Sequence, residues 1–326
     1  MKVASGGLAR DDVVACYRAF LGRDPENEGV IDLQIAQSPT LEHLLKEFIN
    51  SNEFTVKRGS KVSFEDGVVS VFHSRNTDKI EIDVPDDVMK MILSRVIGQW
   101  TVLGEQEPHW AVLSFDDFKQ ENIDKNEGKF YSSGEGSFLV IEEFCKRNKV
   151  NRPKGVCLEL GCGVGRVTHF LAKHFEKVIG FDVSEPILRL ARSYLTSSGD
   201  SNFDLRLLRN LNDLAGAGQY DFFYSIIVLQ HNPPPVMKRL LEISLKQLRK
   251  GGAFLFQVPT HRQDYSFSAK SYLKEEYKGE ANFEMHVFPM YAVLDIIAEA
   301  GCRVKEVIAD NYAGHPGSHT FFGIKP

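Results

Sequence analysis

A short apolar stretch that runs into a cluster of glycines is the part of the sequence best suited to bind a ligand. Residues 156–166 read VCLELGCGVGR, an expected strand followed by a turn and the start of a helix. Gly161, Gly163 and Gly165 let the backbone approach a ligand closely, where a Cβ would block it. The start of the helix adds amide donors and the positive end of the helix dipole. This segment therefore predicts a ligand-binding loop.

An acidic residue at the end of the next expected strand adds to this site. Asp182 ends the segment VIGFD, and a carboxylate at that position can accept two hydrogen bonds from ribose hydroxyls. A dinucleotide site would follow the pattern G-x-G-x-x-G, but its third glycine position is occupied by Arg166. Glu159, before the first glycine, instead suits a cofactor that carries an amino-acid tail in place of a pyrophosphate.

Three segments, in their order along the chain, resemble the class I S-adenosylmethionine-dependent methyltransferases. They are ELGCGVGR (159–166), GFDVSEPILRLAR (180–192) and the segment from Tyr220 to Pro259. The resemblance covers roughly residues 150–326. It implies S-adenosylmethionine as the cofactor and a doubly wound, seven-stranded, mostly parallel α/β sheet with an antiparallel last strand.

The same resemblance implies roles for individual residues. Glu159 would contact the methionine end of the cofactor through water, Asp182 would bind the ribose hydroxyls, and Val183 would pack on the adenine. The family often places an acidic residue after the third strand to bind the adenine amino group, and here Asn210, with Leu211 beside it, takes that position. The complete set of expected cofactor-binding residues is Glu159, Gly161, Gly163, Gly165, Arg166, Asp182, Val183, Asn210, Leu211 and Ser225.

Methyl transfer from a sulfonium requires alignment of the acceptor, the methyl carbon and the sulfur. An alcohol acceptor must also lose a proton, which a histidine or a carboxylate could take. His231, after the expected fourth strand, is the favoured base, and Glu284 and His286 in the long segment 259–289 are alternatives. His231 could instead only bond neighbouring backbone, and segment 259–289 could only cover the cofactor.

Metal and nucleic-acid sites are not expected. His315 and His319 have a metal-like spacing but lie on a loop rich in glycine and proline. The run Asn232–Pro235 is similar to the N-P-P-aromatic motif of adenine N6 methyltransferases, but it lacks an aromatic residue to stack on a flipped base. The chain has 39 Lys and Arg against 44 Asp and Glu, a net charge of −5, whereas nucleic-acid-binding domains usually carry a basic surplus.

Alternating strands and helices must position these residues. From about residue 155 the pattern predicts a doubly wound sheet with helices on both faces. The expected strands are 156–160, 178–182, 204–208, 221–226, 253–258, 304–309 and 319–324, and the expected helices are 164–175, 185–195, 234–249 and 291–300. Only a short loop separates the last two strands, so they can pair antiparallel.

The first half of the chain is expected to hold two further parts. Residues 1–57 are predicted to form a helical module, with helices before Gly22 and after Thr40. Its segment YRAFLGRDPENEG resembles an accessory module attached to bacterial enzymes of surface-polysaccharide assembly. Residues 58–150 are expected to form a connector that contributes to the acceptor site, with short strands at 61–64, 68–72 and 79–84 and a helix from Asp86. The methyltransferase domain would occupy 151–326.

The connector also carries a resemblance of its own. Trp100–Ser114 and Phe130–Gly134 are similar to the segment before the core in bacterial methyltransferases, several of which modify sugars. Its aromatic residues could line a ring-shaped acceptor or seal a domain junction.

The cysteine content and the first residues of the chain favour a cytoplasmic location. The chain of 326 residues has five scattered cysteines without a C-x-x-C pair, and its first residues lack the apolar core of a signal peptide. The expected function is O-methylation of a sugar or glycan. The alternatives are N-, C- or carboxyl-methylation of another small molecule and a non-catalytic cofactor-binding protein. The expected partner is the acceptor, and the N-terminal module could dock a protein.

Overall fold

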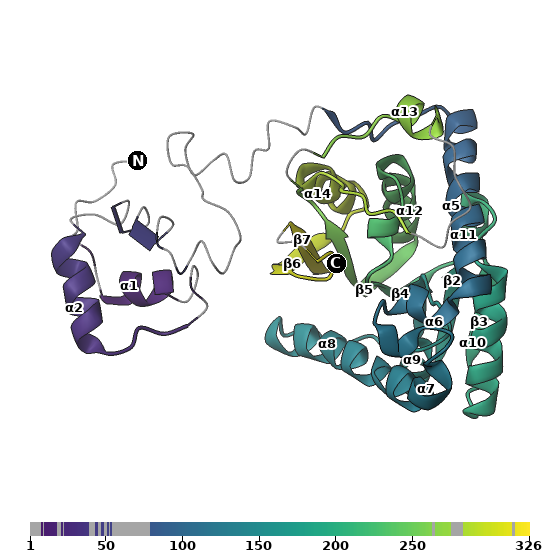
Figure 1. Cartoon of the computed structure of the whole chain (residues 1–326), viewed down its shortest axis with the longest axis horizontal. Coiled ribbons are helices and arrows are strands. Elements are labelled where there is room, and N and C mark those ends of the chain that lie inside the picture. The colour runs from purple at the N-terminus through teal and green to yellow at the C-terminus, as the bar shows by residue number, and fades with distance from the viewer. Residues whose placement is uncertain are drawn as a thin grey trace. The chain divides into compact units, whose positions relative to one another are not determined.

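The computed structural model describes residues 79–262, 265–274, 283–314 and 317–326, together with parts of the segment between residues 8 and 53. The chain divides into two units, Met1–Arg75 and Asn76–Pro326 (Figure 1).

Within the described residues of the first unit, two short helices lie around a small apolar core. α1 spans Arg10–Cys16 and α2 spans Glu28–Gln37. The side chain of Asn27 caps α2 by accepting a hydrogen bond from the amide of Val30, 3.1 Å away. α2 was not predicted from the sequence. Most of the helix expected after Thr40 lies outside the described residues.

The second unit is built on one seven-stranded sheet, which confirms the predicted fold. The strands are β1 (Val156–Leu160), β2 (Lys177–Asp182), β3 (Phe203–Leu207), β4 (Tyr220–Ser225), β5 (Leu248–Pro259), β6 (Arg303–Asp310) and β7 (Ser318–Ile324). Their order is β3-β2-β1-β4-β5-β7-β6, and β7 pairs antiparallel with both β5 and β6. The order reverses between β1 and β4, where α/β sheets of this type bind ligands.

Helices cover both faces of this sheet. They are α5 (Asp86–Gln106), α6 (Pro108–Val112), η5 (Asp116–Phe118), α7 (Ile123–Ser132), α8 (Gly134–Arg147), α9 (Thr168–His174), α10 (Glu185–Ser197), α11 (Leu211–Ala215), η6 (Leu229–His231), α12 (Pro234–Gln247), α13 (Ala269–Lys274) and α14 (Met290–Glu299). Figure 1 shows α12 and α14 on the side of the sheet opposite to α8 and α9. None of the described helices has the length and apolar character needed to cross a membrane.

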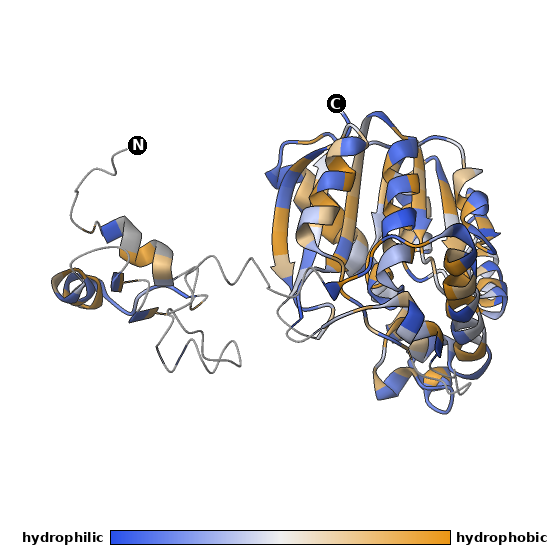
Figure 2. Cartoon of the chain, turned by 90° about the horizontal axis from the view of Figure 1, so that it is seen from above, coloured by the Kyte–Doolittle hydropathy of each residue, from blue (hydrophilic) through white to orange (hydrophobic). Residues whose placement is uncertain are grey.

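The two faces of the sheet take alternate residues of each strand. Leu158 and Phe223 pack in the core that α5, α12 and α14 cover, whereas Cys157 and Phe222 pack in the core beneath α8 and α9. This alternation follows from the two-residue repeat of a strand, and Figure 2 shows the strands as largely hydrophobic. Glu159 therefore points to the α8–α9 side, where it is buried.

The connector differs from the prediction in its secondary structure. The helix from Asp86 is confirmed as α5, but 79–84 is not a strand in the structure, where Ile80 forms only an isolated bridge with Phe267. The strands expected at 61–64 and 68–72 lie outside the described residues. Helices α5 to α8 belong to the second unit. Buried side chains of α5 and α8 complete the two cores of the sheet, whereas α7 packs in a separate cluster with Val164 and Ile187.

Gly134, at the start of α8, packs directly on the end of the glycine loop. A Cβ at this position would lie 2.1 Å from the carbonyl oxygen of Arg166, which is far inside van der Waals contact. Gly136, two residues further along the same helix, has no atom within 4 Å of its Cβ position.

We therefore expect Gly134→Ala to destabilise the protein by about 1–3 kcal/mol, because backbone would have to move. Gly136→Ala is the matched control and should leave the stability unchanged or raise it by up to ~1 kcal/mol, since alanine favours the helix. Denaturant unfolding of the two variants measures this difference. Equal stabilities would contradict the close packing of α8 on the glycine loop.

Candidate active site

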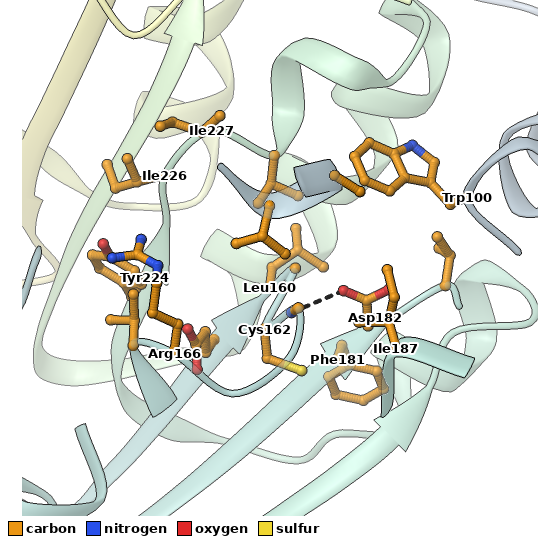
Figure 3. Close-up of a pocket in the computed structure, with 18 of the residues that line it drawn as sticks. Trp100, Leu160, Cys162, Arg166, Phe181, Asp182, Ile187, Tyr224, Ile226 and Ile227 are labelled. Atoms are coloured by element: carbon orange, nitrogen blue, oxygen red, sulfur yellow. Dashed lines mark hydrogen bonds between the residues drawn. The ribbon is translucent and has the colours of Figure 1, made fainter. Parts of the chain in front are cut away.

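A cavity of about 290 Å³ opens at the carboxyl ends of β1, β2 and β4. Figure 3 shows Arg166 and Tyr224 on one side of Leu160 and Asp182 on the other. α5 and α6 contribute Trp100 and Val112 to its wall. The wall also includes Glu159, Gly161, Gly163, Arg166, Asp182, Val183 and Ile227.

The backbone of the glycine loop forms one wall of the cavity. There is no room for a side chain at Gly161 or Gly163. Gly161 and Gly163 have φ values of +74° and +54°, a region that L-residues seldom adopt. A Cβ on Gly161 would lie 2.3 Å from a methyl carbon of Val228, and one on Gly163 would lie 2.9 Å from a methyl carbon of Val112. The loop is therefore held between the end of β4 and helix α6.

Asp182 is fixed by backbone amides at the end of β2. Its two carboxylate oxygens accept hydrogen bonds from the amides of Gly163 and Ser184, each 3.0 Å long. Figure 3 marks the bond to Gly163. Burial raises the pKa of Asp182 to about 6, although these backbone hydrogen bonds act to lower it. Each carboxylate oxygen can accept a further hydrogen bond, so the side chain can still bind hydroxyl groups.

Glu159 brings a second buried carboxyl group to the cavity wall. One of its oxygens accepts a hydrogen bond from the Thr168 hydroxyl, 2.6 Å away. The side chain is almost completely buried, and this burial raises its pKa to about 8. A cationic group in the cavity would stabilise the ionised form.

Arg166 lies in the same wall with incomplete hydrogen bonding. One terminal nitrogen donates to the hydroxyls of Ser133 and Ser137, at 3.2 and 3.3 Å. Its buried Nε has no acceptor among the described residues, and burial lowers the pKa of the guanidinium. A desolvated guanidinium is stabilised by an anion, so this end of the cavity favours a negatively charged group.

The structure brings only part of the predicted cofactor set to the cavity. Gly165 faces Leu195 of α10, and Ser225 donates to the carbonyl of Leu160. Asn210 is exposed and caps α11 by accepting from the amide of Asn212, and Leu211 packs into the core. These four are not part of the cavity wall.

Sequence reasoning also missed several residues of the wall. Leu208, Ala111 and Val112 line the cavity without carrying any polar group that would mark them in a sequence. Val112 lies within the connector segment that resembles other methyltransferases, which is the one signal that pointed to it.

His231 is buried, and both of its ring nitrogens have partners. Its Nδ1 lies 2.9 Å from the carbonyl oxygen of Glu284, so Nδ1 carries the proton and donates. Its Nε2 lies 3.2 Å from the amide nitrogen of Gln230 and accepts from it. Burial lowers the pKa of His231 to about 4, so the ring is neutral at pH 7.

The other two predicted catalytic groups belong to the same buried cluster. His286 lies between the Tyr265 hydroxyl, 2.9 Å from its Nδ1, and a carboxylate oxygen of Glu284, 3.2 Å from its Nε2. Burial acts to raise the pKa of Glu284, but His286, Tyr272 and Arg95 lower it to about 2. The cluster lies beside the cavity, because Trp100 of the cavity wall contacts the His231 ring.

The structure describes one of the two histidines that have a metal-like spacing. His319 lies on β7, where its Nδ1 is 2.8 Å from the Thr260 hydroxyl, and His315 lies outside the described residues. Within the described ranges, no group of three or more His, Cys, Asp or Glu side chains is arranged to hold a metal ion.

Comparison with known proteins identifies the class of this domain. Residues 157–252 match the family described as "Methyltransferase domain". Ubiquinone biosynthesis O-methyltransferase of Acinetobacter baylyi is 26% identical over 161 residues, which cover 48% of this chain and 66% of that protein. The protein of the same name from Thiobacillus denitrificans is 33% identical over 118 residues, covering 36% of this chain and 47% of the relative. The chain thus spans less than two thirds of these relatives.

Solved structures with a related arrangement include two methyltransferases. N-methyltransferase NodS from Bradyrhizobium japonicum, in complex with S-adenosyl-L-homocysteine, has a TM-score of 0.43 and 15% identity, covering 70% of this chain and 99% of that one. Magnesium protoporphyrin IX methyltransferase from Synechocystis, with bound S-adenosylhomocysteine, has a TM-score of 0.42 and 15% identity, covering 60% and 83%. The family match and the sheet order together define a class I S-adenosylmethionine-dependent methyltransferase domain, whose cofactor is S-adenosylmethionine.

The residues of the cavity fit that cofactor. A buried carboxylate at the end of β2 suits a ribose diol, and the bare backbone of the glycine loop admits a ligand at close range. Glu159 in its ionised form and Arg166 have opposite charges on the same wall, and they suit the ammonium and carboxylate groups of a methionine tail.

We expect the affinity for S-adenosylhomocysteine to rise with pH between 6 and 8. An ammonium group placed beside Glu159 would favour its ionised form, and burial raises the pKa of this residue to about 8. Below that pKa, protonation competes with binding and weakens it by at most about tenfold per pH unit, whereas above it the affinity levels off. Asp182, with a pKa of about 6, adds to the slope at the acidic end.

Calorimetric titration at several pH values measures this dependence, and Glu159→Gln serves as the comparison. The glutamine variant should bind more weakly at pH 8 and lose the slope between pH 7 and 8. A slope that is equal in both proteins would show that Glu159 does not contact the ligand.

Proposed function

We propose that the protein is an S-adenosylmethionine-dependent O-methyltransferase that acts on a sugar or glycan hydroxyl. The observation that carries the methyltransferase part is the cavity at the ends of β1 and β2, which combines the Asp182 carboxylate with the Glu159 and Arg166 pair. O-methylation is supported by the names of the relatives, and the glycan acceptor by the aromatic residues beside the cavity and by the resemblances of the N-terminal segments.

Three residues would hold the cofactor in this proposal. Asp182 accepts from the ribose hydroxyls, Glu159 faces the methionine ammonium, and Arg166 donates to the methionine carboxylate. When bound, S-adenosylmethionine supplies an activated methyl group on a sulfonium. The contribution of the protein is then to orient the acceptor oxygen in line with that group and to exclude water.

A row of aromatic side chains next to the cavity supports a ring-shaped acceptor. We call it the aromatic wall, and it consists of Trp100, His231, Phe283 and Trp110. Successive ring centroids lie 5.3, 5.0 and 5.4 Å apart along this row. Such faces, together with a few polar groups, are typical of small-molecule sites.

Few side chains near the cavity could accept the proton of an acceptor hydroxyl. Glu284 is a weak base because its pKa is about 2 and Arg95 pairs with it at 2.8 Å. His231 remains the candidate base, because an acceptor hydroxyl could replace the Gln230 amide at its Nε2 while Nδ1 stays bonded to Glu284. The neutral ring is already in the form that accepts a proton at pH 7.

A base with a pKa of about 4 predicts a distinctive pH profile. With cofactor and acceptor saturating, kcat should be independent of pH between 5.5 and 7.5, because His231 stays deprotonated throughout. Measurement of initial rates over this range tests the assignment. A different result would be a fall in kcat at acidic pH with an apparent pKa near 6.5, which is absent in His231→Gln. That result would contradict the assignment, because it would show that the His231 ring is exposed and titrates normally during turnover.

The proposed function is tested by a panel of acceptors. Purified protein is incubated with S-adenosylmethionine and with methyl glycosides, nucleotide sugars, phenols, amines or carboxylates, and the release of S-adenosylhomocysteine is measured. We expect turnover with a sugar hydroxyl, and no turnover by Asp182→Ala with any acceptor. Turnover with amines or carboxylates alone would contradict the glycan proposal and favour methylation of another small molecule. Cofactor binding without turnover would favour a binding protein of this fold.

A further inference from the structure

Ile227 has an unusual backbone conformation at the edge of the cavity. It follows β4, lines the cavity and has a φ of +60°. β-branched residues adopt this region very rarely, so the surrounding structure must hold the residue there. Its amide donates a hydrogen bond, 3.1 Å long, to the side-chain oxygen of Gln257 on β5.

The side chain of Gln257 is completely buried, and its orientation is fixed by its partners. Because the Ile227 amide can only donate, the atom facing it is the oxygen of Gln257. The Gln257 amide nitrogen then donates to the side-chain oxygen of Gln230 at 3.0 Å and to the Ser318 hydroxyl at 2.7 Å.

The chain of hydrogen bonds continues from Gln230 to the aromatic wall. With its oxygen occupied by Gln257, Gln230 presents its amide nitrogen to Nε2 of His231, and Nδ1 of His231 donates to the carbonyl of Glu284. The backbone carbonyl of Gln230 also accepts from the amide of His286, 2.7 Å away. In each of the four hydrogen bonds that lead from Ile227 through Gln257, Gln230 and His231 to Glu284, the donor is on the Ile227 side.

This segment carries one member of the aromatic wall. Phe283 directly precedes Glu284, and its ring contacts both Trp110 and His231. The position of the Phe283 ring therefore depends on the backbone that His231 and Gln230 hold in place.

We propose that Gln257 is a positioning residue for the acceptor: through Gln230 and His231 it sets the place of Phe283 in the aromatic wall. The expected change in KM rests on the proposed function. The expected change in the order of the aromatic wall does not, because it can be measured without turnover. None of the three residues proposed to hold the cofactor has a hydrogen bond to Gln257 among the described contacts.

Gln257→Met tests the proposal, because methionine has a similar shape and cannot form the three hydrogen bonds. Gln247→Met is the matched control, since Gln247 bonds only backbone carbonyls of Leu214 and Ile243 in the described residues. The two tryptophans of the chain, Trp100 and Trp110, both belong to the aromatic wall, so their fluorescence reports its order directly.

Three measurements are compared between these variants. In Gln257→Met we expect at least a doubled Stern–Volmer constant for acrylamide quenching and a change of less than threefold in the Kd of S-adenosylhomocysteine. With the acceptor found by the panel, KM should rise about tenfold and kcat should change less, because binding geometry and not the cofactor is affected. Gln247→Met should match the unaltered protein in all three.

Unchanged quenching in a folded Gln257→Met variant would overturn the proposal, and so would a loss of cofactor affinity as large as the rise in KM. If this variant does not fold, Gln230→Met removes the next link of the chain and must give the same pattern. Failure of the proposed function alone would leave the quenching and cofactor-binding results intact, so the two failures are distinguishable.

Discussion

The hydrogen bond from the Gly163 amide to the Asp182 carboxylate joins the two parts of the cavity. It links the loop after β1 to the end of β2, and a second bond from Ser184 ties the same carboxylate to the start of α10. A carboxylate at this depth is unfavourable without such donors, because its hydration has been lost. The positive φ of Gly163 turns its amide toward Asp182, which a residue with a Cβ would do only at a steric cost. The loop side and the Asp182 side of the cavity wall are therefore fixed relative to each other.

The sequence predicted the sheet well because each strand and its crossover helix carries its own local signal. Apolar runs ended by Gly161 or Asp182, and amphipathic helices such as α10 and α12, depend on neighbours that lie close in the chain. The bounds of β5 were less accurate, since Arg249 and Lys250 look like a helix end although both belong to the strand. The connector was less predictable still, because residues distant in the chain complete the apolar faces of its helices. These residues lie on α10 for α7 and on the sheet for α8.

The site shows the same division between local and distant determinants. Glu159, Gly161, Gly163 and Asp182 could be assigned from one motif and the strand after it, and all line the cavity. The state of the histidines could not be assigned, because it depends on Gln230, on Arg95 of α5 and on a segment more than fifty residues away from His231. Sequence reasoning could identify a histidine near the acceptor. It could not show that both ring nitrogens already have partners.

The position of β7 has a consequence for biosynthesis. β7 lies between β5 and β6, and β6 pairs only with β7 in the sheet. As the nascent polypeptide leaves the ribosome, residues 303–310 emerge with no pairing partner, and the apolar edge of β5 stays open until residues 318–324 follow. Chains with an uncovered strand edge are prone to aggregate. Translation pauses or truncations before β7 should therefore recruit chaperones even though the cofactor-binding strands have already been made.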